Sequence, residues 1–69
     1  MLYLVKGTVT DEDVRESFTC AAEAPSKTTA LDFVVRRFRS DGYDTVTIAS
    51  AERWCKRSGW STGETLRYD

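Results

Sequence analysis

The chain has 69 residues, of which 41% are hydrophobic and 30% charged, with ten Lys and Arg residues against eleven Asp and Glu residues. This length fits one domain and excludes a two-domain enzyme with a cleft between its lobes. The apolar fraction is that of globular proteins, so we expect a single folded domain over residues 1–69. Because the sequence contains no His, mechanisms that need an imidazole base or an imidazole metal ligand are excluded.

Two segments at the start of the chain have the alternating pattern of a β-hairpin. Residues 2–10 and 14–24 alternate apolar and polar side chains, which is typical of strands with one solvent-exposed face. The acidic residues 11–13 between them predict a turn. In the second strand, Cys20 shares the apolar face with Phe18, so we expect its thiol to lie in the core.

A helix is predicted over residues 27–40, where apolar residues recur at spacings of three and four. Ser26 precedes the helix and is a suitable N-cap, because its hydroxyl can accept a hydrogen bond from a free backbone N–H of the first turn. Gly42 suits the left-handed residue that ends a helix, and Tyr43 after it is expected to pack against Phe38.

A third strand is predicted over residues 45–55, and residues 64–68 alternate weakly enough to form a short fourth strand. The order of elements is therefore ββαβ(β), an α+β fold with one helix packed on one face of an antiparallel-rich sheet of three to four strands. The core is expected within residues 1–55, with residues 56–69 as a C-terminal tail or short strand. The third strand could lie beside the first, in the sheet centre, or beside the second. In that third strand, the residues expected to face the helix are Val46, Ile48 and Trp54, and those expected to face away are Thr45, Thr47, Ala49 and Ala51.

The residue types argue against catalysis and against bound cofactors or metals. A nucleophilic Cys or Ser needs a nearby base, and no motif places one beside Cys20 or Cys55. Structural zinc needs four Cys or His ligands, whereas the chain has two Cys and no His. We therefore predict that the protein is not an enzyme and that both thiols stay reduced.

The N-terminal residues 1–5 are apolar but too few for a signal peptide or a membrane anchor, and no segment approaches the roughly 18 apolar residues that span a bilayer. We therefore expect a cytoplasmic protein that does not contact a membrane.

The near-neutral net charge conceals two charged regions. Residues 1–24 contain two basic and five acidic residues, and residues 33–60 contain six basic and three acidic residues. Each region is a candidate for binding a partner of opposite charge. The first candidate is the acidic group Asp11, Glu12, Asp13 and Glu16, and the second is the basic and aromatic group Arg53, Trp54, Lys56, Arg57 and Trp60.

The segments Tyr3–Val9, Phe18–Ala24 and Asp41–Ile48 resemble small single-domain proteins of bacteriophages and mobile elements, a class that includes several anti-CRISPR proteins. The resemblance implies a non-catalytic inhibitor in the cytoplasm of a bacterial host. Such inhibitors occupy a surface of a CRISPR effector complex, in some cases by imitating DNA with acidic residues. The resemblance assigns no role to an individual residue.

Three hypotheses follow for the partner. The first is a host protein or protein complex, such as a CRISPR effector, that the chain blocks sterically. The second is nucleic acid, bound through residues 53–60, whose basic and aromatic side chains suit phosphate contact and base stacking. The third is a second copy of the chain, paired through an exposed sheet edge.

Overall fold

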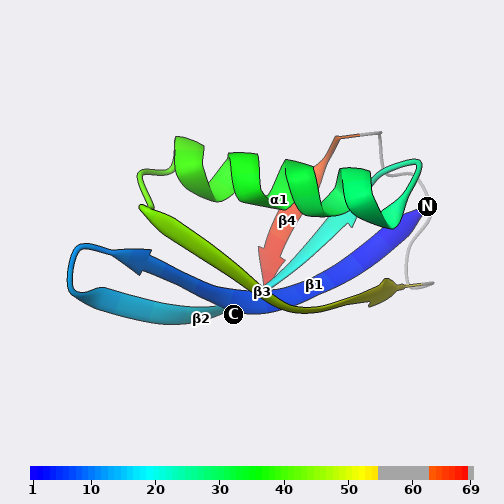
Figure 1. Cartoon of the computed structure of the whole chain (residues 1–69). Helices are drawn as coiled ribbons and strands as arrows, with labels where there is room; N and C mark the ends of the chain where they lie inside the picture. Colours follow the sequence, from blue (N-terminus) through cyan, green and yellow to red (C-terminus); the bar gives the residue numbers. More distant parts are fainter. Residues whose placement is uncertain (55–62, 69) are drawn as a thin grey trace.

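A computed structural model describes residues 1–54 and 63–68 of the chain. One helix packs on one face of an antiparallel sheet, which confirms the predicted α+β fold (Figure 1). The elements are β1 (Leu2–Asp11), β2 (Val14–Glu23), α1 (Lys27–Ser40), β3 (Thr45–Arg53) and β4 (Thr65–Tyr68).

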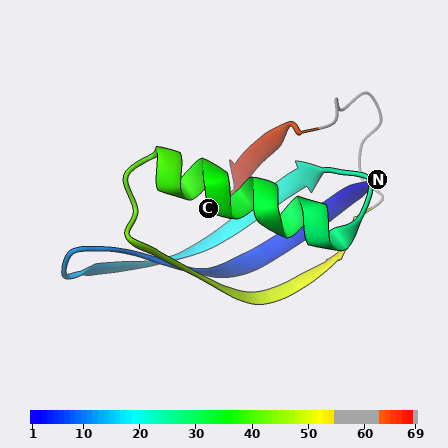
Figure 2. The same ribbon diagram turned by 45° about the horizontal axis from the view of Figure 1, so that its top comes forward.

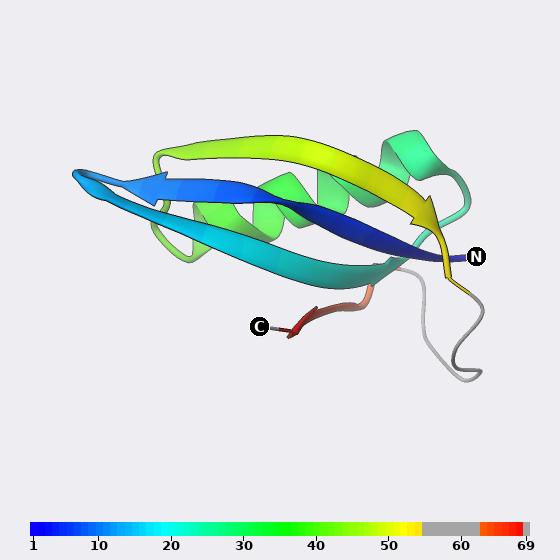
Figure 3. The same cartoon turned by 90° about the horizontal axis from the view of Figure 1, so that it is seen from below.

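The strands lie in the order β3-β1-β2-β4, and each neighbouring pair is antiparallel. Strand β3 therefore lies beside β1, which decides between the three positions that the sequence left open. Seen from the face away from α1, β3, β1 and β2 run side by side with the helix behind them (Figure 3). The β1–β2 register extends from Leu2 opposite Glu23 to Asp11 opposite Val14, so the hairpin loop has only two residues.

The helix begins and ends where its local signals predict. The Ser26 hydroxyl accepts a hydrogen bond from the Thr29 backbone N–H at 3.2 Å, which satisfies one of the free donors of the first turn. At the other end, Gly42 has a φ of 100°, and the Tyr43 N–H donates to the Phe38 carbonyl oxygen at 3.1 Å. The helix runs diagonally across the sheet, as the tilted view shows (Figure 2).

The core lies between α1 and the sheet and contains few large side chains. Phe38 of α1 stacks against Phe18 of β2 with 4.5 Å between ring centroids, and its other edge meets Tyr43 at 5.6 Å. Burying a side chain of this size stabilises the fold by about 2–3 kcal/mol. Small residues such as Ala22 and Ala30 are fully buried in the same core. The predicted core position of Cys20 is confirmed, because only 1% of its surface is exposed.

A β-bulge interrupts the pairing of β1 with β3. The register shifts between Lys6 and Gly7, which leaves Ala49 without a partner residue in β1. A Cβ atom at Gly7 would lie 2.1 Å from the Thr47 carbonyl oxygen, so the close approach of the two backbones requires glycine.

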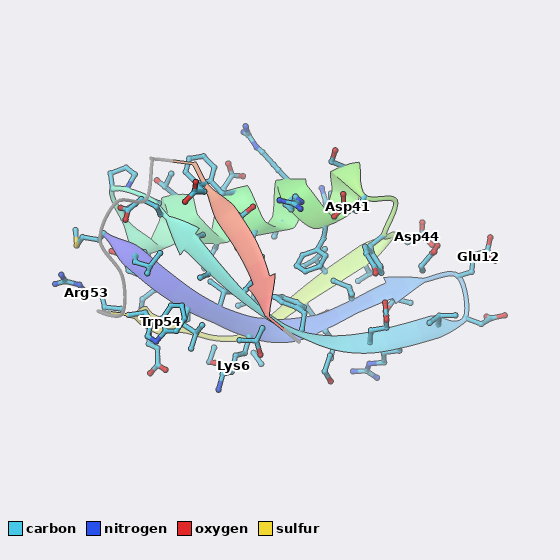
Figure 4. All side chains as sticks on the ribbon, turned by 180° about the vertical axis from the view of Figure 1, so that it is seen from behind. Lys6, Glu12, Asp41, Asp44, Arg53 and Trp54 are labelled. Atoms are coloured by element: carbon cyan, nitrogen blue, oxygen red, sulfur yellow. The ribbon has the colours of Figure 1, made fainter. Side chains whose placement is uncertain are left out.

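The bulge also shifts the alternation of β3 by one residue. Ala51 therefore packs against the core, and the prediction that it faces away from the helix was wrong. The prediction that Trp54 faces the helix was also wrong. Its backbone N–H donates to the Leu2 carbonyl oxygen at 2.8 Å, and its ring lies on the sheet face opposite α1 (Figure 4).

Candidate protein-interaction surfaces

The β1–β2 turn is held in an unusual backbone conformation by the loop after α1. Glu12 has a φ of 55°, a left-handed conformation that costs about 1 kcal/mol for a residue other than glycine. Its backbone N–H donates to the Asp44 carboxylate at 3.1 Å. The Asp44 N–H in turn donates to the Thr10 carbonyl oxygen at 2.8 Å. These two hydrogen bonds fasten the turn to the start of β3.

This connection gathers carboxylates from two parts of the sequence at one end of the molecule. The side chains of Glu12, Asp41 and Asp44 extend at the same end, where the hairpin turn meets the loop after α1 (Figure 4). All of these residues are exposed. We call this group the acidic end, and it consists of Asp11, Glu12, Asp13, Glu16, Asp41 and Asp44.

The sequence interpretation found four of these six residues and missed the other two. Asp41 and Asp44 belong to a segment whose overall charge is positive, so counting charges along the chain assigned them to the basic region. Only the path of the chain through the fold brings these two residues to the acidic end. A helix of 14 residues spans about 21 Å and returns the chain from the end of β2 to the hairpin turn.

Two side-chain contacts fix parts of the acidic end. The Tyr43 hydroxyl donates to the Glu16 carboxylate at 2.8 Å, and Tyr43 is itself held against Phe38. Asp41 lies 3.4 Å from the Arg37 guanidinium in an exposed ion pair, an interaction worth less than about 1 kcal/mol.

The tip of the turn keeps its negative charge and carries an apolar residue. Within residues 1–54 and 63–68, no ion pair neutralises Asp11, Glu12 or Asp13. Val14, directly opposite Asp11 in the hairpin, is 59% exposed. The end of the hairpin therefore presents an apolar side chain with Asp11 opposite it and Asp13 and Arg15 as its chain neighbours.

The second predicted surface lies only partly within the described residues. Arg53 ends β3 and is exposed, and Trp54 after it is half-buried. Both lie at the opposite end of the molecule from Glu12 (Figure 4), and the longest dimension of the chain is 37 Å. The two predicted surfaces are therefore separate. The remaining predicted residues of this surface, Lys56, Arg57 and Trp60, lie outside the described part of the chain, as does Cys55.

Two of the three arginines of α1 contact partners close to the helix. Arg36 forms an ion pair with Asp32 at 3.0 Å. Arg37 contacts Asp41 and also donates to the Thr65 hydroxyl of β4 at 3.1 Å. Both side chains therefore engage partners at the helix surface, in the half of α1 nearer the acidic end.

In the described residues, no group of three or more His, Cys, Asp or Glu side chains is arranged to hold a metal ion. No helix among them is long and apolar enough to cross a membrane. Comparison of the chain with protein-family models, with curated proteins and with solved structures found no match.

Proposed function

We propose that this protein is a small non-catalytic binding protein that docks its acidic end on a positively charged surface of a host protein and blocks that surface. The observation that supports this proposal is the gathering of six carboxylates from two separate segments at the end of the molecule where Val14 is exposed. An apolar contact close to charges combines the burial and the charge complementarity that protein interfaces use.

The contacts within the acidic end favour binding because they limit motion before a partner arrives. The Glu12 N–H is fixed by Asp44, and the Glu16 carboxylate is fixed by Tyr43. Groups that are already in place lose less conformational entropy on association. The exposed negative charge also steers a basic partner toward this end, and the effect weakens as salt is added.

The partner class that fits this chemistry is a protein surface that ordinarily binds nucleic acid, because such surfaces present Lys and Arg to phosphates. Together with the resemblance to small phage proteins, this makes a CRISPR effector complex of a bacterial host the proposed target. In this proposal, the chain acts by occupying the nucleic-acid surface and performs no reaction.

The test is a pull-down from bacterial lysates that contain CRISPR effectors, with the Asp11→Lys/Asp13→Lys variant as the probe of the acidic end. The matched control is Asp32→Lys/Glu64→Lys, which makes the same change in net charge at exposed positions elsewhere. We expect the wild-type chain and the control to retain the same effector subunit, and the acidic-end variant to lose it. In cells, only the first two should restore plaque formation by a phage that the CRISPR system restricts.

Retention of the same subunit by all three proteins, or by none, would contradict the proposal. Raising the salt concentration in the wash provides a second measurement. Release of the subunit from the wild-type chain is expected within a few-fold increase of ionic strength, since exposed charges are screened over about 8 Å at physiological salt.

Nucleic-acid binding through residues 53–60 is the second candidate, favoured by Arg53 beside the partly exposed ring of Trp54. Under this alternative, the variant Arg53→Glu/Lys56→Glu/Arg57→Glu loses affinity for single- and double-stranded DNA in filter binding, whereas the acidic-end variant gains affinity. If the wild-type chain binds no DNA at low salt, this alternative is wrong.

A further inference from the structure

Strand β3 is an edge strand whose residues are all accessible. In the strand order β3-β1-β2-β4, nothing in the described part of the chain lies beyond β3. Every residue from Thr45 to Arg53 is at least partly exposed, whereas β1 and β2 each contain several buried residues. An edge strand of nine residues presents unpaired N–H and C=O groups and is a template for a further strand.

The helix-facing side of this edge is apolar. Val46, Ile48 and Ala51 pack against the core but remain partly exposed, and so does Leu31 of α1. Arg37, which contacts β4, lies on a different flank of the helix from Leu31 and Val35. It is roughly a third of a turn around the helix from Leu31 and nearly half a turn from Val35. A row of incompletely buried side chains therefore follows the seam between α1 and β3.

We infer that a second copy of this chain occupies the edge, with β3 of each subunit paired antiparallel to β3 of the other. Antiparallel pairing of identical strands is closed by a two-fold axis, so one surface serves both subunits. Residues 45–51 contain no charged side chain, so identical copies meet there without repulsion. The pairing places both helices on the same face of one continuous sheet.

The bulge restricts the register of this pairing. Because of the bulge, the side chains that face the helix have even residue numbers before Ala49 and odd residue numbers after it. Side chains of the two copies therefore meet on a common face only when the residues before Ala49 in one copy lie opposite the residues after Ala49 in the other. In the register centred between Ile48 and Ala49, Val46 lies opposite the partner's Ala51 on the helix side. On the other face, Thr47 lies opposite the partner's Ser50.

Charge favours the same register. In this register, Asp44, which directly precedes β3, comes opposite the partner's Arg53 at the end of the paired strand. The two-fold axis repeats this contact at the other end. Opposite charges directly across a strand pair stabilise it, whereas like charges destabilise it. The two ends of the molecule therefore complement each other when two copies run antiparallel.

The experiment measures self-association of the full chain by sedimentation equilibrium from about 10 µM to about 1 mM, a range that detects association from weak to moderate. We expect the wild-type mass to rise from that of the 7.8 kDa chain toward twice that value. The variant Thr47→Lys/Ser50→Lys places like charges opposite each other and should weaken association by about tenfold. The variant Thr47→Lys/Ser50→Glu places opposite charges in contact and should restore it.

The matched control is Ser17→Lys, an exposed position of β2 on the same sheet face but away from the edge, which should associate like the wild-type chain. Far-ultraviolet circular dichroism of each variant checks that the subunit remains folded. A wild-type chain that stays monomeric throughout the range overturns the inference. It is also overturned if both double variants associate equally, or if β3 pairs only with a different protein.

This inference does not depend on the proposed function. The Asp11→Lys/Asp13→Lys variant should lose the host partner and keep its self-association. The Thr47→Lys/Ser50→Lys variant should keep the host partner and lose its self-association. Each proposal can therefore fail while the other is still supported.

Discussion

Strands β2 and β3 flank the same central strand, yet the sheet buries them to very different extents. The helix-facing residues of β2, such as Phe18 and Cys20, are almost completely buried. The equivalent residues of β3, Val46 and Ile48, have comparable hydrophobicity and remain partly exposed. Part of the difference lies in what is beyond each strand, since β4 pairs with β2 at Cys20, whereas β3 forms the edge among the described residues. Phe18 lies outside the β4 pairing and is covered instead by Phe38 of α1. Burial in so small a domain therefore depends on the position of a strand as much as on its composition.

The largest expected effect comes from truncating one residue of each strand. Phe18→Ala should lower the free energy of unfolding by about 3–5 kcal/mol because it leaves a cavity beside Phe38. A loss of that size equals the whole stability expected of a single small core, so we expect this variant to be unfolded. Ile48→Ala should lower it by only about 1–2 kcal/mol, since part of that side chain is already exposed. Urea denaturation measures the loss for Ile48→Ala, and circular dichroism without denaturant shows whether Phe18→Ala is unfolded. A Phe18→Ala variant that is folded and loses no more stability than Ile48→Ala would remove the distinction between the strands.

A smaller loss is expected for Gly7→Ala, whose new Cβ atom clashes most severely with β3 and also lies 3.0 Å from the Phe18 ring of β2. The new Cβ would meet the Thr47 carbonyl oxygen, so β3 must move away from β1, at a cost of about 2 kcal/mol. Hydrogen exchange should then become faster at the backbone amides of β3 that bond to β1, while those of the β1–β2 ladder stay protected. Uniform acceleration across the sheet would show instead that the two pairings open together.

A loss of about 1 kcal/mol is expected for Asp44→Ala, which removes the hydrogen bond from the Glu12 N–H at the hairpin turn. The control Asp44→Asn keeps an acceptor oxygen and should retain most of the stability. Thermal unfolding followed by circular dichroism separates the two variants. If both lose the same amount, the charge of Asp44 matters more than its hydrogen bond.

The smallest effect, and one of opposite sign, is expected for Glu12→Gly. Glycine adopts a φ of 55° without strain, and this gain exceeds the extra entropy that it brings to the unfolded chain, so the free energy of unfolding should rise by about 0.5 kcal/mol. Asp13→Gly, at the neighbouring turn position, is the comparison and should lower it. A decrease for Glu12→Gly would indicate that its carboxylate contributes to folding.

The helix and the hairpin were predictable because their signals are local. Ser26 and Gly42 mark the ends of α1 within a few residues of the backbone groups that they affect. The order of β3 and its bulge were not predictable in this way. The need for glycine at position 7 arises from the Thr47 carbonyl oxygen, which is 40 residues away in the chain. Alternation read straight through β3 consequently placed Ala51 and Trp54 on the wrong faces.

The same limit applies to the acidic end. Asp11, Glu12, Asp13 and Glu16 are close in sequence, so a charge count finds them. Asp41 and Asp44 join them only because α1 carries the chain back to the hairpin turn, and the hydrogen bond from Glu12 to Asp44 has no sequence signature. The basic and aromatic surface remains a prediction for its residues beyond Trp54.

The extra residue Ala49 in β3 has a consequence for solubility. Without it, the register of β3 with β1 would be continuous. The side chains of the edge strand would then alternate regularly between the two sheet faces along its whole length. A regular, uncharged edge can pair with another in several registers that differ by two residues, and such slippage permits open-ended aggregation. With the bulge, the faces match only when the first half of one strand lies opposite the second half of the other, which removes most of these registers. Deletion of Ala49 should therefore leave the subunit folded but lower the concentration at which the protein precipitates.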